Sequence, residues 1–139
     1  MKIKEYNAFV NYASQKRKIY LDGLQDFTAL LKDMQNISVK DRSSRAKKLL
    51  KPLEKATNEL KEYTPSLSQQ TPEKQETALA WKEALTNAMM CRVEELKILS
   101  SNKELSQEDL DNLLHYDKQH LEYYNETIKQ GDKLDSLIK

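Results

Sequence analysis

The chain has 139 residues, of which 32% are charged and 38% hydrophobic, and its formal net charge at pH 7 is +1. This balance provides no overall attraction for nucleic acid or an anionic membrane, and the single cysteine excludes an intramolecular disulfide and a thiolate-rich metal site. Because the sequence has only 2 glycines and 3 prolines, it lacks the turn residues of a β-rich fold and predicts long amphipathic helices.

The first predicted helix covers residues 3–35 and carries the strongest periodic pattern. One heptad row, apolar except for a single arginine, runs from Ile3 to Leu31, and the row beside it runs from Tyr6 to Met34. Apolar positions that alternate by three and four over this length are typical of a helix packed into a multi-helix core. Arg17 falls on the first row, where a buried charge needs a partner.

The second helix is predicted over residues 39–63. Ser38 precedes it as a cap, and Asp41 follows three residues later in the spacing of a capping box. The apolar phase continues through Pro52, which favours one helix kinked at the proline over two separate helices. The alternative interpretation of Pro52 is the first turn of a new helix.

The third and fourth helices are predicted over residues 72–100 and 107–138. Thr71 caps the third, and a proline and an acidic residue follow in its first turn. Ser106 and Asp109 have the spacing of a capping box at the start of the fourth. The expected core stripe of this last helix contains Leu110, Leu113, Leu114, Leu121, Tyr124, Ile128, Leu134 and Ile138.

These elements predict a single all-α domain over residues 1–139, folded as an up-down-up-down antiparallel four-helix bundle with a kink at Pro52. No apolar run is long enough to cross a bilayer, and the first ten residues lack the apolar core of a signal peptide. A cytoplasmic location is therefore expected, or an extracytoplasmic one if a signal segment has been removed. Frequent Lys, Asn, Tyr and Ile are typical of a low-GC bacterium or its phage.

Two charged residues fall on predicted core stripes of neighbouring helices. Arg92 lies on the row of Leu85 and Leu99, and Asp117 on the row of Leu110. Counted in turns from the connection between the two helices, they lie within about one turn of each other, so we expect a buried Arg92–Asp117 pair with a structural role. In the alternative, both side chains reach water along the flanks of their helices.

Residues with metal-binding or catalytic chemistry are few. His115 and His120 each have an aspartate on the same helix face, but the paired motifs of a di-iron bundle are missing. Cys91 adjoins an arginine, yet neighbours in sequence do not share a helix face. We therefore expect no catalytic residue, no metal and no cofactor, and a half-buried structural role for His120.

The charge pattern is the more informative surface feature. Basic residues cluster early in the second helix, acidic residues cluster between 104 and 126, and exposed tyrosine is favoured at protein interfaces. The candidate binding residues are Arg42, Arg45, Lys47, Lys48 and Lys51 in the basic run, with Tyr116 and Tyr123 on the fourth helix.

The expected function is a non-enzymatic one, exerted through contacts with another protein or a second copy, as in an adaptor, immunity-type or envelope-associated domain. The alternative is nucleic-acid or anionic-surface binding through the basic run, which lacks stacking aromatics. The stripes predict that Leu24→Ala or Leu121→Ala costs about 2–5 kcal/mol. Exposed charges contribute little, so Arg42→Glu combined with Lys48→Glu is expected to leave folding nearly unchanged.

Overall fold

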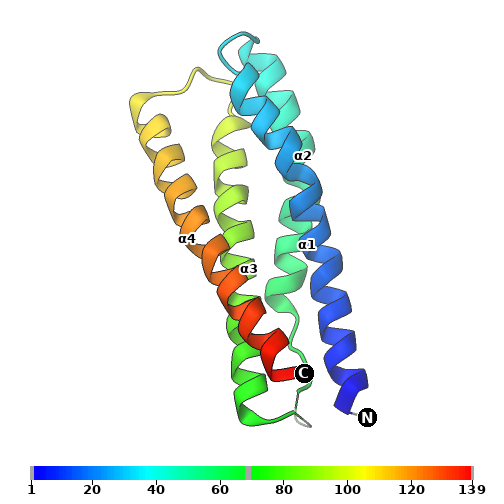
Figure 1. Ribbon diagram of the computed structural model, residues 1–139. Helices are drawn as coiled ribbons and strands as arrows, with labels where there is room; N and C mark the ends of the chain where they lie inside the picture. The colour runs from blue at the N-terminus through cyan, green and yellow to red at the C-terminus, as the bar shows by residue number, and fades with distance from the viewer. Residues whose placement is uncertain (1, 68–69, 139) are drawn as a thin grey trace.

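The computed structural model describes residues 2–67 and 70–138, and these residues form four α-helices and no β-strand. The expected all-α class is confirmed, and each helix bound lies within two residues of the expected one. The helices pack as a bundle with both chain ends at the same end (Figure 1). They are α1 (Lys2–Asp33), α2 (Val39–Glu62), α3 (Pro72–Leu99) and α4 (Gln107–Ile138).

Side-chain caps start three of the helices where the sequence places them. The Ser38 hydroxyl accepts a hydrogen bond from the Asp41 amide at 3.1 Å. At the start of α4, the Ser106 hydroxyl accepts from the Asp109 amide at 3.1 Å, and the Asp109 carboxylate accepts from the Ser106 amide at 3.0 Å, which completes a capping box. At the start of α3, the Thr71 hydroxyl likewise accepts a hydrogen bond from a backbone amide. Pro52 lies inside a single α2 helix.

The helices do not enclose the core evenly. α3 packs against both α2 and α4, and α1 packs mainly on α2. Among the described residues, no Cα atom of α1 lies within 8 Å of a Cα atom of α4. The first turns of α4 also diverge from α1 at the upper end of Figure 1. The side between these two helices, called the α1–α4 seam below, is therefore bridged by side chains alone.

The open seam changes which residues of α1 are buried. The row from Tyr6 to Met34 contributes fully buried side chains at its centre. The row from Val10 to Leu31 faces the seam, so Arg17 is exposed rather than buried and Leu24 is only half-buried. The expected core role of Arg17 is wrong because α4 does not cover this row. The largest buried side chains of the core include Phe9, Tyr20, Phe27, Leu30, Leu60, Leu85, Met89, Leu96 and Leu99.

The leucine stripe of α4 is likewise not the buried face. Leu114 is 70% exposed and Leu121 is 59% exposed, whereas His120 and Leu134 are buried. Consecutive residues point about 100° apart around a helix, so burying His120 turns Leu121 out of the core. The expected core role of Leu121 is wrong. The exposed apolar row of α4, called the α4 row below, consists of Leu110, Leu114, Leu121 and Ile128.

The end of the bundle that carries the α1–α2 and α3–α4 connections is held by Arg42. Its Nε donates to the Leu99 carbonyl at 3.0 Å, and its Nη2 donates to the carbonyls of Ser101 and Lys103 at 2.6 and 2.7 Å. The Ser43 hydroxyl donates to the Ser100 carbonyl at 2.6 Å beside it. Arg42 is only 5% exposed, so its expected place on a solvated basic surface is wrong. Its side chain instead satisfies the last carbonyl of α3 and two carbonyls of the connection that follows.

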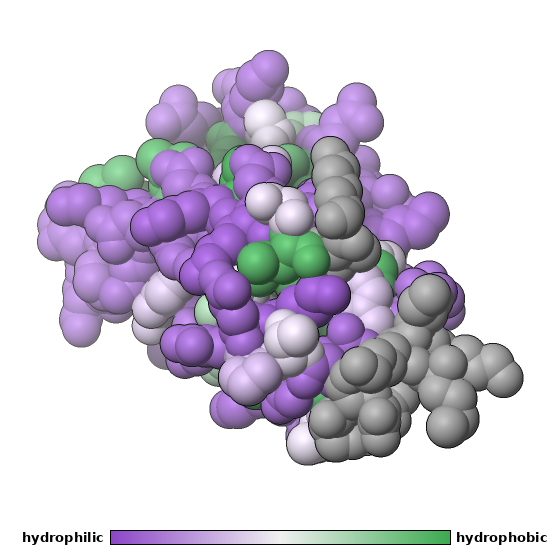
Figure 2. Space-filling model, turned by 60° about the horizontal axis from the view of Figure 1, so that its bottom comes forward, coloured by the Kyte–Doolittle hydropathy of each residue, from purple (hydrophilic) through white to green (hydrophobic). Residues whose placement is uncertain are grey.

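The opposite end, where the chain termini lie, is mostly hydrophilic, with a small hydrophobic patch near its centre (Figure 2). It offers no broad apolar area in this view. Within the described part of the chain, no helix is long and apolar enough to cross a membrane. The exposed large apolar side chains therefore lie mainly on the side of the bundle, along α4.

Candidate functional site

Apart from Arg42, the predicted basic residues of α2 lie at the surface of the protein. Lys47, Lys48 and Lys51 are exposed and border one shallow hollow. Arg45 is half-buried and forms an ion pair with Asp33 at 3.0 Å, which ties it to α1. Without Arg42, the accessible part of the predicted basic run is therefore a short lysine face.

The two candidate tyrosines lie on α4 and are half-buried rather than exposed. Tyr123 packs against the hydrophobic core, and Tyr116 lies beside His115 with ring centroids 5.6 Å apart. Among the described residues, α2 and α4 have no Cα atoms within 8 Å of each other. The structure therefore does not join the tyrosines and the lysine face into one site.

The expected Arg92–Asp117 pair does not form. Arg92 is 6% exposed, but Asp117 is exposed on α4. Arg92 Nη1 instead lies 3.5 Å from the Glu95 carboxylate, and Nη2 lies 3.4 Å from both ring nitrogens of His120. Asp117 precedes His120 by three positions and lies near it on α4, but it is the His120 ring that contacts Arg92.

A buried polar cluster thus joins three helices. The Tyr20 hydroxyl of α1 and Nε2 of His120 of α4 share a hydrogen bond across the seam. The Arg92 guanidinium from α3 lies over the Phe27 ring, with its carbon 3.8 Å from the ring centroid, in a cation–π contact. His120 is buried rather than half-buried as expected, because it bridges Arg92 and Tyr20.

Burial shifts the titration of this cluster. Desolvation raises the pKa of Glu95 to about 7 against the opposing pull of Arg92. Desolvation, aided by Arg92, lowers the pKa of His120 to about 4. Desolvation also raises the pKa of Tyr20 to about 12. At neutral pH the His120 imidazole and the Tyr20 phenol are therefore uncharged, and the Glu95 carboxyl is present in both its protonated and its ionised form.

The described residues do not support a catalytic nucleophile or a metal site. Burial raises the pKa of the Cys91 thiol to about 11, which disfavours the reactive thiolate. Among residues 2–67 and 70–138, no three His, Cys, Asp or Glu side chains gather so as to hold a metal ion. His115 is exposed on α4, five positions before the buried His120.

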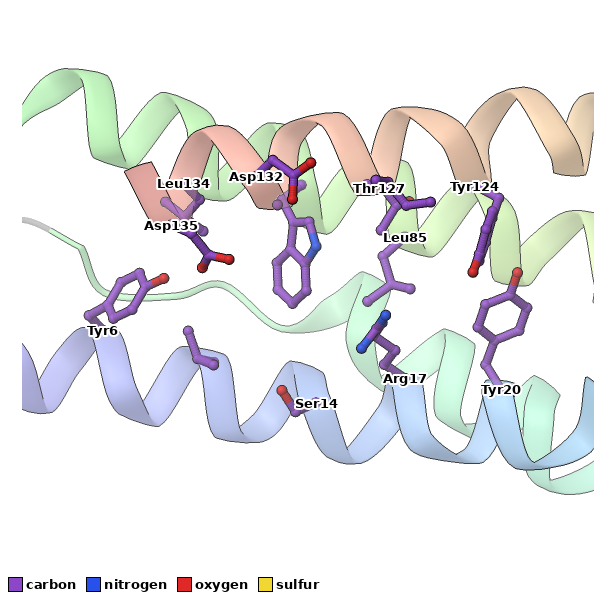
Figure 3. Close-up of a pocket in the computed structure, with 14 residues that line it drawn as sticks. Tyr6, Ser14, Arg17, Tyr20, Leu85, Tyr124, Thr127, Asp132, Leu134 and Asp135 are labelled. Atoms are coloured by element: carbon purple, nitrogen blue, oxygen red, sulfur yellow. The ribbon is translucent and has the colours of Figure 1, made fainter. Parts of the chain in front are cut away.

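A cleft of about 310 Å³ opens beside the cluster, between α1 and the last turns of α4 (Figure 3). The Tyr20 and Tyr124 side chains point toward each other at one end, and Arg17 reaches into the cleft from α1. At the other end Asp135 lies near Tyr6, whose pKa is raised first by burial and then by that carboxylate. The cleft therefore has aromatic walls and charges of both signs.

The α4 row continues this cleft along the seam. Ile128 lines the cleft, and Leu121, Leu114 and Leu110 follow it toward the start of α4. Sequence reasoning missed this surface because it placed the same leucines in the core. A search of family models, of curated proteins and of solved structures finds no protein that this chain matches.

Proposed function

We propose that the protein acts without catalysis, by binding another protein, and that it holds an amphipathic helix of that partner against the α4 row. The observation that supports the proposal is the row itself. Four large apolar side chains lie exposed along one side of one helix, at the spacing of helix-packing positions. Large apolar side chains exposed along one face are typical of interaction sites, and a helix laid in a groove is a common way to cover them.

The charges near the α4 row favour a partner with basic residues beside its apolar face. Asp111, Asp117, Asp132 and Asp135 are all exposed on α4. Asp117 lies between Leu114 and Leu121 along the helix, so a cation of the partner would meet it at the centre of the contact. Complementary charge would set the register and speed association more than it would add affinity.

The same proposal treats the fold as an up-down-up-down antiparallel bundle with α2 kinked at Pro52. Connections of a few residues and the two chain ends at one end of the bundle support this topology. In such a bundle α1 and α4 are the first and the last helix of the chain. A partner helix along the seam would contact both and bury the apolar row that α1 leaves uncovered.

Photo-cross-linking from two adjacent positions tests the proposal. A photoreactive phenylalanine analogue would replace Leu121 in one variant and Glu122 in the other. Both residues are exposed, but they point about 100° apart around the helix. Each variant would be irradiated in living cells of the source organism, and the adducts identified by mass spectrometry.

We expect one protein to be captured from position 121 and far less of it from position 122. The cross-linked peptide of that protein should be an amphipathic helix with Lys or Arg beside its apolar face. Leu114→Glu in the same chain should abolish the adduct while the melting temperature stays the same. Equal capture from both positions, or an adduct insensitive to Leu114→Glu, would refute the proposed surface.

A second candidate function is binding of an anionic surface or nucleic acid by α2. It is favoured by one observation: Lys47, Lys48 and Lys51 remain exposed around a shared hollow. Affinity for such a partner would fall steeply with salt, with about one released counterion for each phosphate contact. Filter binding at several salt concentrations, with the three lysines changed to glutamate as the control, distinguishes this function from the first.

A further inference from the structure

A second hollow, of about 300 Å³, lies between α1 and α2 and is closed from below by α3. Gly23 of α1 and Pro52 of α2 border it. Gly23 has no side chain, and a Cβ atom added there would meet no atom within 4 Å, which shows how open this point is. The space therefore arises because α1 offers no side chain where it passes α2.

Arg92 forms part of the lining of this hollow, and its hydrogen-bonding capacity is poorly used. Its Nε is buried and has no hydrogen-bond partner among the described residues. Its contacts to Glu95 and His120, at 3.5 and 3.4 Å, are longer than the roughly 2.7–2.9 Å of a strong charge-assisted bond. A buried guanidinium with an unpartnered Nε and only long polar contacts is less well compensated than buried charges normally are.

We propose that the hollow binds a small molecule with a single carboxylate and an apolar body. Carboxylate oxygens accept charge-assisted hydrogen bonds from a guanidinium, and Arg92 is the cationic side chain in the lining of the hollow. The apolar body would contact the remaining walls, and a hollow of this size lies at the lower end of the range for small-molecule pockets. The apolar walls are Ile19, Leu24, Phe27, Leu49, Leu53 and Leu96.

The charges around the hollow restrict the ligand further. Asp22 and Asp26 are exposed and also border it, so a molecule with several negative charges would be repelled at the entrance. Glu95 competes only weakly for the guanidinium, because burial raises the pKa of its carboxyl to about 7. A monocarboxylate therefore fits the hollow better than a phosphate ester or a nucleotide. This site is independent of the α4 row and of its proposed partner.

Isothermal titration of the whole protein with octanoate tests the proposal, with 1-octanol as the uncharged probe of matched length. We expect one octanoate per chain, bound about tenfold or more tighter than octanol, since a charge-assisted bond to Arg92 is available only to the carboxylate. Gly23→Leu keeps Arg92 but fills the hollow, so this variant should lose octanoate binding. Leu114→Glu on the α4 row should bind octanoate as the wild type does.

Any of the following results would overturn the proposal: equal affinity for octanol, unchanged binding by Gly23→Leu, or no octanoate binding at millimolar concentration. Arg92→Met should reduce the affinity for octanoate to that for octanol. If Arg92→Met does not fold, the octanol comparison and Gly23→Leu decide the question without it. Loss of octanoate binding in Leu114→Glu would place the probe on the α4 row and also overturn the proposal.

Discussion

Replacing Arg42 by alanine should weaken the bundle more than any other single change of a charged residue on α2. Its guanidinium accounts for hydrogen bonds to the carbonyls of Leu99, Ser101 and Lys103, at 3.0, 2.6 and 2.7 Å. The side chain therefore joins the first turn of α2 to the end of α3 and the connection that follows it. Alanine would leave all of these carbonyl groups without that donor.

The expected loss follows from the type of bond. A hydrogen bond to a charged group contributes about 1.5–3 kcal/mol, but bonds that share one guanidinium are not additive. We therefore expect Arg42→Ala to lower the free energy of unfolding by about 3–5 kcal/mol, a large part of the roughly 5–15 kcal/mol of a typical domain. Arg42→Glu should be worse, since a carboxylate would face carbonyl oxygens.

Urea unfolding followed by far-UV circular dichroism measures this loss. Lys48→Ala is the matched control, because Lys48 is exposed on the same helix and should change stability by no more than about 0.5 kcal/mol. Arg42→Lys should recover only part of the loss, because a lysine ammonium cannot reach several carbonyls with the planar fork of arginine. If the free energy of unfolding of Arg42→Ala lies within about 1 kcal/mol of the wild-type value, the hydrogen bonds of Arg42 are not a source of stability.

In the same urea experiment, Leu60→Ala should lower the free energy of unfolding by about 2–5 kcal/mol, because Leu60 is fully buried. Leu121→Ala should lower it by about 0.5 kcal/mol or less, because Leu121 is exposed. Similar losses for the two variants would contradict the orientation of α4. Gly23→Ala should stabilise the protein by about 0.5–1 kcal/mol, since the new methyl group enters open space in a helix interior, and a fall in melting temperature would argue against it. The pKa of Glu95, raised from 4.5 to about 7, means that the folded state holds this proton more tightly, so its contribution is lost as pH rises through that range. The stability of Glu95→Gln relative to wild type should therefore increase by about 3 kcal/mol between pH 4.5 and pH 8, and a constant difference across urea titrations in that range would refute the assignment. His120, with a pKa lowered from 6.5 to about 4, acts in the opposite direction, and stability is lost as pH falls through its range.

Local signals in the sequence predicted the secondary structure well. Cap residues such as Ser106 and Thr71 act within one turn of their own helix, so the positions at which helices begin are encoded by a few neighbouring residues. Pro52 was placed inside one helix because the apolar phase continued through it, and α2 is indeed continuous there. These features need no knowledge of the other helices.

The rotation of α4 could not be read in the same way. Two neighbouring rows compete for the core on this helix, and the row with more leucines is the one left exposed. The buried row contains His120 and Thr127, which are favoured there because Arg92 and Tyr20 come from other helices to meet His120. The pattern of hydrophobicity along one helix does not show which polar side chains of other helices will contact it.

Charged residues were misplaced for a related reason. Arg42 belongs to a run of basic residues, and composition alone gives it the same exposed role as Lys48. What distinguishes it is the end of α3, whose free carbonyls attract a guanidinium after the helices have packed. Glu95 also carries no signal of burial in the hydrophobic pattern, although its position three residues after Arg92 places both side chains on one face.

The uneven closure of the bundle also bears on the order in which the chain folds. The bond between Tyr20 and His120 joins residues 100 positions apart, whereas the main helix contacts connect neighbours along the chain. Closing so long a loop is entropically costly, and among the described residues only side chains make contacts across the seam to offset that cost. The α2–α3–α4 contacts should therefore form in the rate-limiting step and the seam afterwards. Tyr20→Phe would then accelerate unfolding and leave the refolding rate unchanged in a stopped-flow chevron analysis.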